Sequence, residues 1–282
     1  MENFNVVNYH ITNRCNYDCT YCFGKFEGQH DPSIDDAKAV VDNIALYFTE
    51  NGIANGRINL AGGEPTLYKH LDELIDYIAS RGISVSMVTN GSRLCAESIR
   101  RWKEKVCCIG LSVDSASDDT NRNIGRCCNE RVLSSKELVK IADAIHECGI
   151  ELKINTVVSN FNLNEDLSKV YGAMAPDRIK LFQMHLVKGI NDRARDHKIT
   201  KKEFKSFCKR HNAFRSVIVK EPKKSMENSY LMVNPNGEFQ LNDNGNYKTY
   251  GNLKDTPLCK ILEAVPLLEK RFALRYKKGV RK

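Results

Sequence analysis

The chain has 282 residues, of which 41% are hydrophobic and 28% are charged. This composition excludes a disordered or collagen-like protein, and the length suits one large α/β domain or two smaller ones. No run of about 18 apolar residues occurs, so we expect no membrane-spanning helix. The N-terminal segment MENFNVVNYHIT lacks the pattern of a signal or transit peptide, which favours a cytoplasmic protein without a membrane partner.

Positive charge is concentrated in the last third of the chain. Residues 1–180 contain 20 Lys and Arg against 25 Asp and Glu, whereas residues 181–282 contain 23 against 10. A basic segment of this kind suggests an anionic partner, such as a nucleic acid, an acidic membrane surface or a phosphorylated small molecule. A solvated, lysine-rich surface explains the charge equally well, and composition does not decide between these partners.

The first 185 residues alternate short β-rich runs with longer helical patterns. We predict strands at Val6–Ile11, Ile58–Leu60, Ser84–Val88, Cys107–Val113, Lys153–Val157 and Ile179–Met184. We predict helices at Pro32–Asn51, Tyr68–Ser80, Cys95–Lys105, Ser134–Cys148 and Leu163–Met174. This alternation predicts an α/β fold with parallel strands, in a doubly wound sheet or a closed or partial barrel. In each case chemistry gathers at the C-terminal ends of the strands.

The pattern changes after about residue 186, where shorter elements predict an α+β extension. We predict loops at Lys188–Lys198 and Asn242–Tyr250. We predict helices at Lys201–His211 and Leu258–Val265. Short strands with a hairpin turn between the last two are predicted at Val217–Val219, Tyr230–Val233 and Phe239–Leu241. The tail Arg271–Lys282 is strongly basic.

Three of the 11 cysteines form the motif Cys15-Asn-Tyr-Asp-Cys19-Thr-Tyr-Cys22, directly after the first predicted strand. An odd number of cysteines without a secretory signal argues against a disulfide framework. A structural zinc site needs four N or S ligands, and the nearest histidines, His10 and His30, lack the usual spacing. A [4Fe–4S] cluster needs one ligand per iron, so three cysteines leave one iron open to a small molecule. The spacing favours a cluster over zinc or a chance grouping.

The CxxxCxxC spacing, with the aromatic Tyr21 before the last cysteine, resembles the signature of the radical SAM superfamily. In that family S-adenosylmethionine chelates the open iron, and one-electron reduction cleaves it to a 5′-deoxyadenosyl radical. The sequence Ala-Gly-Gly-Glu-Pro at 61–65 matches the family motif that holds the methionine amino group. Polar residues after the third and fourth strands resemble contacts to the cofactor's ribose and carboxylate. The implied cofactor-binding residues are Gly62, Gly63, Glu64, Asn90, Ser92, Ser112 and Arg126.

Longer stretches of the chain resemble the viperin family of radical SAM enzymes. They include NYHIT before the cysteines, KINTV at Lys153–Val157, RIKLFQ at Arg178–Gln183 and NSYL at Asn228–Leu231. The resemblance runs from about residue 6 to about residue 276. It implies a partial, TIM-like (β/α)6 barrel over residues 1–185. It also implies a basic C-terminal extension, residues 186–282, that closes the barrel and contacts a nucleotide.

The viperin resemblance implies a radical SAM nucleotide dehydratase. Viperins convert a ribonucleoside triphosphate, CTP in animals and CTP, UTP or GTP in microbes, to its 3′-deoxy-3′,4′-didehydro analogue, an antiviral RNA chain terminator. The implied reaction removes hydrogen from the ribose 4′ carbon, loses the 3′ hydroxyl as water and takes up one electron and a proton. We also expect an external electron donor of the flavodoxin or ferredoxin type, and a monomeric enzyme.

Cations on predicted strands point to a phosphorylated substrate. Lys153, Arg178 and Lys180 lie on or beside the fifth and sixth strands, where an unpaired charge is costly. Three cations that face one cavity need an anion, and a triphosphate suits them. The resemblance adds further substrate contacts at Asn8, Arg57 and Arg275. It also implies two catalytic residues near the reacting sugar, of which the tyrosine donates a hydrogen atom or proton: Asn155 and Tyr230.

Two other functions fit parts of the sequence. A radical SAM enzyme that modifies a peptide or another small molecule shares the cysteine motif, but such enzymes usually carry further cysteine-rich motifs near the C-terminus. Here only Cys208 and Cys259 lie beyond residue 150. A basic, metal-stabilised RNA-binding module is the non-enzymatic alternative, and it predicts a steep salt dependence of RNA binding. The viperin interpretation expects no nucleic-acid partner.

Overall fold

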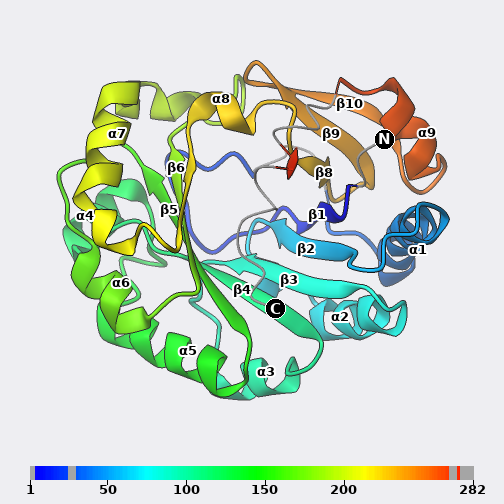
Figure 1. The fold of residues 1–282 in the computed structure, drawn as a ribbon, viewed down its shortest axis with the longest axis horizontal. Helices are drawn as coiled ribbons and strands as arrows, with labels where there is room; N and C mark the ends of the chain where they lie inside the picture. Colours follow the sequence, from blue (N-terminus) through cyan, green and yellow to red (C-terminus); the bar gives the residue numbers. More distant parts are fainter. Residues whose placement is uncertain (1–3, 25–29, 267–271, 274–282) are drawn as a thin grey trace.

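The computed structural model describes residues 4–24, 30–266 and 272–273. Its first six strands run side by side in one curved sheet, and each neighbouring pair among them is parallel (Figure 1). This arrangement confirms the predicted series of parallel strands. The strands are β1 (Val6–Thr12), β2 (Arg57–Gly62), β3 (Ser84–Thr89), β4 (Val106–Ser112), β5 (Glu151–Val158) and β6 (Arg178–Gln183).

Helices surround the outer side of this sheet (Figure 1). The five predicted helices are confirmed, and a sixth, Asp118–Ile124, was not predicted because its sequence DDTNRNI is almost entirely polar. No helix among the described residues is both long enough and apolar enough to cross a membrane. The helices are α1 (Ile34–Glu50), α2 (Leu71–Ser80), α3 (Ala96–Arg101), α4 (Asp118–Ile124), α5 (Ser135–Glu147) and α6 (Ser168–Met174), with a short 3₁₀ helix η1 (Pro65–Leu67).

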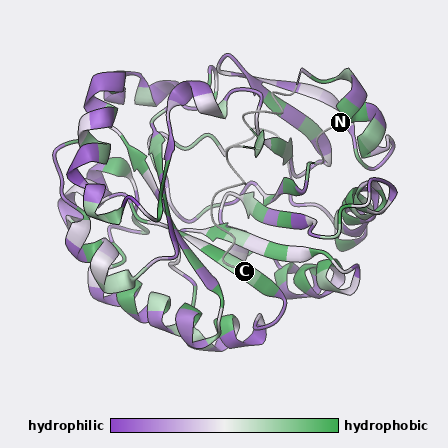
Figure 2. Ribbon diagram, viewed as in Figure 1, coloured by the Kyte–Doolittle hydropathy of each residue, from purple (hydrophilic) through white to green (hydrophobic). Residues whose placement is uncertain are grey.

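Side-chain caps fix where several of these helices begin. The hydroxyl of Ser33 accepts a hydrogen bond from the backbone N–H of Asp36 at the start of α1. Ser134 and Glu137 form a reciprocal capping box at the start of α5. Figure 2 shows hydrophilic and hydrophobic residues alternating along the surrounding helices, as expected for helices with one face on a core. The helix starts are therefore encoded locally, and their apolar faces dock them on the sheet.

The residues after 186 extend both ends of the same sheet. β7 pairs in parallel with β6, β8 pairs in parallel with β1, and β9 and β10 continue from β8 in antiparallel pairs. The described sheet has edges at β10 and β7, so it is a partial barrel, as predicted. The elements are η2 (Asp192–His197), α7 (Lys201–Arg210), η3 (Asn212–Phe214), β7 (Ile218–Glu221), α8 (Lys223–Met226), β8 (Leu231–Val233), β9 (Glu238–Asp243), β10 (Asn246–Asn252) and α9 (Leu258–Ala264).

Two predictions for this extension were wrong. The Asn- and Gly-rich segment 242–250, predicted as a loop, contains the end of β9 and most of β10. Asn244 and Gly245 have φ angles of 53° and 83°, so this pair forms a tight hairpin turn rather than part of a long loop. The predicted loop 188–198 contains the 3₁₀ helix η2. The hairpin between β8 and β9 is confirmed.

Alternation along β5 separates the core of the protein from its inner cavity. Leu152 and Ile154 are fully buried in the apolar core between sheet and helices. Lys153, Asn155 and Val157 point to the opposite side and line a cavity inside the curved sheet. The inner side of the sheet therefore carries charged and polar side chains among apolar ones, which a structural core alone does not require.

Candidate active site

One cavity of about 280 Å³ lies inside the curved sheet, and most of the predicted site residues line it. Its lining includes strand ends and the loops that follow them, which is where sheets of this kind place their chemistry. Its size is near the lower end of the range for small-molecule sites. The predicted residues in its lining are Asn8, Cys15, Cys19, Cys22, Arg57, Gly62, Gly63, Asn90, Ser112, Arg126, Lys153, Asn155, Lys180 and Tyr230.

Three predicted site residues lie outside this lining. Glu64 is buried behind it, and the hydroxyl of Ser92 accepts a hydrogen bond from the side chain of Asn16 at 2.9 Å. Arg178 is buried, and its guanidinium lies 3.6 Å from the carboxylate of Glu151. One more predicted site residue, Arg275, falls outside the described residues. The contacts predicted for Glu64 and Ser92 with the cofactor, and for Arg178 and Arg275 with the substrate, stay predictions.

The end of α4 holds one edge of the loop that carries the cysteines. The backbone N–H groups of Asp18 and Thr20 donate to the carbonyls of Gly125 and Ile124 at 3.1 Å and 2.8 Å. Gly125 has a φ angle of 81°, and a Cβ there would lie 2.4 Å from the Asp18 carbonyl oxygen. Only glycine therefore allows this close approach.

Two side chains from the segment after β6 hold the opposite edge of the cysteine loop. Arg193 donates to three backbone carbonyls at 2.7, 3.0 and 3.4 Å and also pairs with the Asp18 carboxylate at 2.7 Å. Asn191 donates to a fourth carbonyl at 3.0 Å. The accepting carbonyls belong to the consecutive residues Asp18, Cys19, Thr20 and Tyr21. Sequence analysis missed both residues, because their partners lie 170 to 175 positions away and no local pattern marks them.

The paired glycines at the end of β2 pack against the start of the same loop. A Cβ at Gly62 would lie 2.3 Å from the carbonyl oxygen of Thr12, and one at Gly63 would lie 2.1 Å from that of Arg14. Gly62 also has a φ angle of 126°, which favours glycine. The two glycines therefore let the backbone before the cysteines approach the end of β2 closely, and their predicted contact with the cofactor stays a prediction.

Glu64 orders the turn after β3 from behind the cavity. One carboxylate oxygen accepts from the hydroxyl of Thr89 at 2.7 Å, and the other accepts from the backbone N–H of Asn90 at 2.7 Å. The Asn90 side chain in turn donates to the side-chain oxygen of Asn16 at 2.9 Å, beside the cysteine loop. Because Glu64 bonds to protein groups, it fixes the position of Asn90 in the cavity wall.

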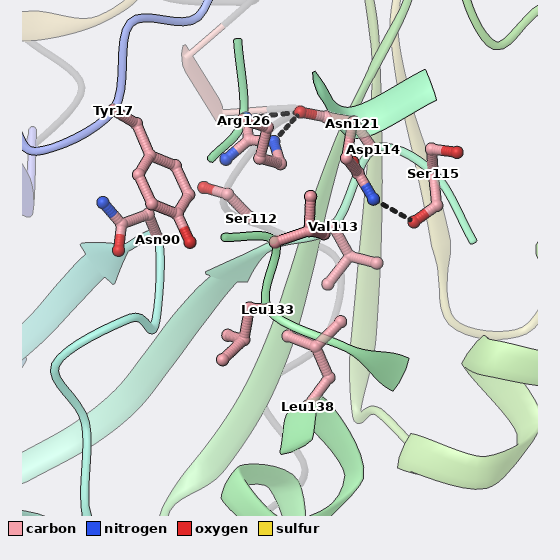
Figure 3. A pocket seen from close by; sticks show the side chains of 11 residues that line it. Tyr17, Asn90, Ser112, Val113, Asp114, Ser115, Asn121, Arg126, Leu133 and Leu138 are labelled. Carbon is pink, nitrogen blue, oxygen red and sulfur yellow. Dashed lines mark hydrogen bonds and ion pairs between the residues drawn. The ribbon is translucent and has the colours of Figure 1, made fainter. Parts of the chain in front are cut away.

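Arg126 forms an ion pair with Asp114 beside a small cavity of about 10 Å³ (Figure 3). The same carboxylate accepts from the hydroxyl of Tyr21 at 2.6 Å and from the backbone N–H of Val157 at 2.7 Å. Burial lowers the pKa of Arg126, but the Asp114 carboxylate, together with Cys19 and Tyr21, outweighs it and holds that pKa well above its usual value. Arg126 therefore stays charged in the cavity wall, and its contact with a cofactor carboxylate stays a prediction.

The three cysteines suit a cluster better than a single metal ion. No three His, Cys, Asp or Glu side chains of the described residues are arranged to hold one ion, whereas a structural zinc site needs four ligands at one point. The three thiols lie around one cavity, as expected when each thiolate binds its own iron. Burial raises the pKa of Cys19 to about 12 and also raises that of Cys15, so both thiols release a proton on binding metal.

Cations from three strands line the cavity together with the cysteines. They are Arg57 at the start of β2, Lys153 on β5 and Lys180 on β6. Burial is the largest cause that lowers the pKa of Lys153, and the positive charges of Arg57 and Arg178 lower it further. Lys153 therefore lies close enough to Arg57 and Arg178 to be repelled by them, and an anion in the cavity would relieve that repulsion.

Gly110 on β4 makes room for two of the predicted substrate contacts. A Cβ at Gly110 would lie 2.6 Å from Cε of Lys153 and 3.1 Å from Nδ2 of Asn155. The side-chain oxygen of Asn155 is buried and has no hydrogen-bond partner within the described part of the chain. A single glycine inside a strand often marks such a close approach, and sequence analysis did not use this signal.

Comparison with known proteins agrees with this geometry. Residues 9–172 match the Radical SAM superfamily. A nucleotide dehydratase dependent on S-adenosylmethionine, from Psychrobacter lutiphocae, is 32% identical over 97% of this chain and 95% of its own length. Another from Flammeovirga pacifica is 34% identical over 91% of this chain and 89% of its own. The chain belongs to the S-adenosylmethionine-dependent nucleotide dehydratases of the radical SAM superfamily. This is the viperin family that the sequence resembles.

A solved structure supports the fold of this radical SAM dehydratase. SuiB of Streptococcus suis bound to S-adenosylmethionine superposes with a TM-score of 0.65 at 15% identity, over 95% of this chain and 68% of that one. At that identity the likeness bears on the fold alone. Radical SAM proteins use a [4Fe–4S] cluster and S-adenosylmethionine, and the donor set of Cys15, Cys19 and Cys22 fits such a cluster.

We expect Arg193→Leu to loosen the cysteine loop of this radical SAM dehydratase. The change leaves three loop carbonyls without their donor, so the metal-free chain should lose about 2 kcal/mol of unfolding free energy. The anaerobically reconstituted variant should lose iron to a chelator about tenfold faster than the wild type. Arg195→Leu is the matched control. Among the interactions of the described residues, Arg195 pairs with its neighbour Asp192 at 3.3 Å and not with the cysteine loop. Equal iron loss from Arg193→Leu and wild type would contradict this role.

We expect Gly110→Ala to impair nucleotide binding without unfolding the protein. The new methyl group displaces the Lys153 and Asn155 side chains, so KM for the nucleotide should rise about tenfold, which corresponds to about 1.4 kcal/mol. Gly172→Ala in α6 is the control, because a Cβ there meets nothing within 4 Å. Steady-state kinetics under anaerobic conditions measure both variants, and an unchanged KM in Gly110→Ala would show that the position does not control the cavity.

Proposed function

We propose that this enzyme dehydrates a ribonucleoside triphosphate to its 3′-deoxy-3′,4′-didehydro analogue, an antiviral RNA chain terminator. CTP is the favoured substrate, with UTP or GTP as the alternatives. The observation that carries this proposal is that three cysteines and the three cations of β2, β5 and β6 line the same cavity. One part of this lining suits the cluster and its cofactor, and the other suits a polyanion, so the two reactants meet inside one enclosed site.

The phosphate groups are proposed to bind the cations of β2, β5 and β6. Lys180 is a buried side chain and Lys153 a half-buried one on adjacent strands, where positive charge is costly without an anion. A triphosphate offers several negative charges in a short chain of oxygens, which matches closely spaced cations. A neutral peptide offers no such charge, so the cavity favours a nucleotide over the peptide alternative.

The ribose is proposed to lie beside Asn155, between the phosphates and the cysteines. The buried oxygen of Asn155 has no hydrogen-bond partner among the described residues, and a ribose hydroxyl is a donor that would satisfy it. Tyr230 lines the same cavity with a hydroxyl that is able to donate a hydrogen atom or proton. When bound to the three cysteines, the cluster with S-adenosylmethionine supplies the hydrogen-abstracting radical. The protein residues position the sugar and exclude water.

The base is proposed to enter a side cavity of about 50 Å³ that shares Phe182, Tyr230 and other residues with the main one. His185 and Asn242 provide polar groups in its lining. Burial is the main cause that lowers the pKa of His185, so its ring is neutral at pH 7 and able both to donate and to accept hydrogen bonds. The small volume favours a pyrimidine, which supports CTP or UTP over GTP.

Electrons are proposed to come from an external donor of the flavodoxin or ferredoxin type. The overall change from the nucleotide to the didehydro product plus water is a dehydration, and the cleavage of S-adenosylmethionine in each turnover consumes reducing equivalents. No redox partner of the chain is identified, so purified donors of both types, or dithionite, suit the assays below.

The direct test is a competition among CTP, UTP, GTP and ATP with the anaerobic, reconstituted enzyme. Mass spectrometry should detect one predominant product that has lost one water, and 5′-deoxyadenosine should accumulate only when that nucleotide is present. If 5′-deoxyadenosine forms equally with and without nucleotides, the proposed substrate class is wrong and the peptide alternative gains support.

We expect Lys153→Met to weaken binding of every nucleoside triphosphate by about 10- to 100-fold, because one charged phosphate contact is lost. The four nucleotides should be affected alike, since the phosphates are common to all. Lys220→Met is the matched control, because Lys220 is an exposed lysine on β7 of the same sheet. Calorimetric titration of the anaerobic holoenzyme measures the affinities. Equal affinities in Lys153→Met and Lys220→Met would remove Lys153 from the phosphate site.

A further inference from the structure

We propose that Glu221 is a positioning residue that holds Lys180 and Tyr230 in the substrate cavity and competes with the nucleotide for Lys180. This inference rests on the proposed function, in which Lys180 contacts phosphate and Tyr230 acts near the sugar. Glu221 itself does not line the cavity. It therefore acts through the two residues that do.

Glu221 is the last residue of β7, and its side chain is 3% exposed. One carboxylate oxygen, Oε1, lies 3.3 Å from Nζ of Lys180 and 3.3 Å from the hydroxyl of Tyr230, which donates to it. The other oxygen accepts from the hydroxyl of Ser225 at 3.1 Å. A single buried carboxylate thus joins β6, the turn at α8 and the residue before β8.

The two cavity residues that share this oxygen also contact each other. Nζ of Lys180 lies 5.6 Å from the centre of the Tyr230 ring and 5.9 Å from that of Phe182. Ser229, next to Tyr230, donates through its hydroxyl to the Ser225 carbonyl at 2.7 Å. Two of the hydrogen bonds of Ser225, from its hydroxyl to Glu221 and from Ser229 to its carbonyl, link the turn before Tyr230 to Glu221, so the carboxylate helps to place the tyrosine hydroxyl.

Electrostatics make Glu221 a competitor of the substrate. A buried lysine and a buried carboxylate each need a partner, and here they partner each other before any nucleotide arrives. A triphosphate that binds Lys180 must share it with Glu221, so the carboxylate weakens nucleotide binding. The same carboxylate orients the phenol of Tyr230, so it supports turnover. Glu221 is therefore expected to act on affinity and on rate in opposite directions.

The isosteric change Glu221→Gln separates these two effects. Without the negative charge, Glu221 no longer competes electrostatically for Lys180, so the nucleotide should bind about fivefold or more tightly, the size of a typical coupling between two ligands of one group. Tyr230 loses its charged acceptor, so kcat should fall by at least about tenfold. A residue that only supports the fold would instead weaken binding and lower the melting temperature.

The experiment uses the anaerobic holoenzyme, with calorimetry for nucleotide affinity and product formation for kcat. The double variant Glu221→Gln/Tyr230→Phe should be no slower than Tyr230→Phe alone, because Glu221 acts on the rate through Tyr230. Glu73→Gln is the control: it removes a carboxylate that pairs with a lysine, Lys38, at 2.7 Å outside the cavity lining, and it should not lower kcat or tighten nucleotide binding.

The outcomes distinguish this inference from the proposed function. If the wild-type enzyme neither binds nor converts any nucleoside triphosphate, the proposed function fails. If the wild type is active but Glu221→Gln binds the nucleotide less tightly, or keeps its full kcat, the positioning role of Glu221 is wrong. Additive losses of kcat in the double variant would also overturn it.

Discussion

Buried positive charge inside the curved sheet is the constraint on which the rest of the site depends. Lys153 and Lys180 stand on adjacent strands whose outward neighbours form the apolar core, so neither side chain reaches solvent freely. Carboxylates behind the cavity offset part of this charge, Glu221 for Lys180 and Glu151 for Arg178. The cavity remains suited to a polyanion. Glu221 shares one carboxylate oxygen between Lys180 and Tyr230, so the ammonium group of Lys180 is still able to bind a phosphate oxygen as a second acceptor.

The cysteine loop has to be fixed relative to these cations for the site to work. Hydrogen bonds hold the loop along both edges, from the end of α4 on one side and from Arg193 and Asn191 on the other. Gly62 and Gly63 let the loop start lie directly on β2, the strand that also carries Arg57. Strand β2 thus joins the start of the cysteine loop to Arg57. Positioning of this kind accounts for much of the rate in cofactor enzymes.

The fold could be predicted from the sequence wherever a local pattern carries it. The six parallel strands and their helices follow from hydrophobic period and caps, whereas the polar helix α4 has no such period and was missed. The prediction for the segment that forms β10 was wrong, because the Asn244-Gly245 pair was interpreted as part of a loop and not as a tight turn. In the site, the cysteines and cations were predicted together, since motif spacing and charges on strands are local signals. Arg193 contacts Asp18, 175 positions away, and Glu221 pairs with Lys180, 41 positions away, so only the folded chain brings them to these partners.

The central claim is that a nucleotide lies in this cavity with its ribose facing the cysteines. The most direct measurement uses the preferred nucleoside triphosphate carrying deuterium at the ribose 4′ carbon, with the anaerobic reconstituted enzyme and a reductant. Mass spectrometry of the 5′-deoxyadenosine formed should find one deuterium per molecule, together with a nucleotide product that has lost that deuterium and the 3′ hydroxyl. 5′-Deoxyadenosine without deuterium, formed at the same rate when the nucleotide is left out, would contradict the account.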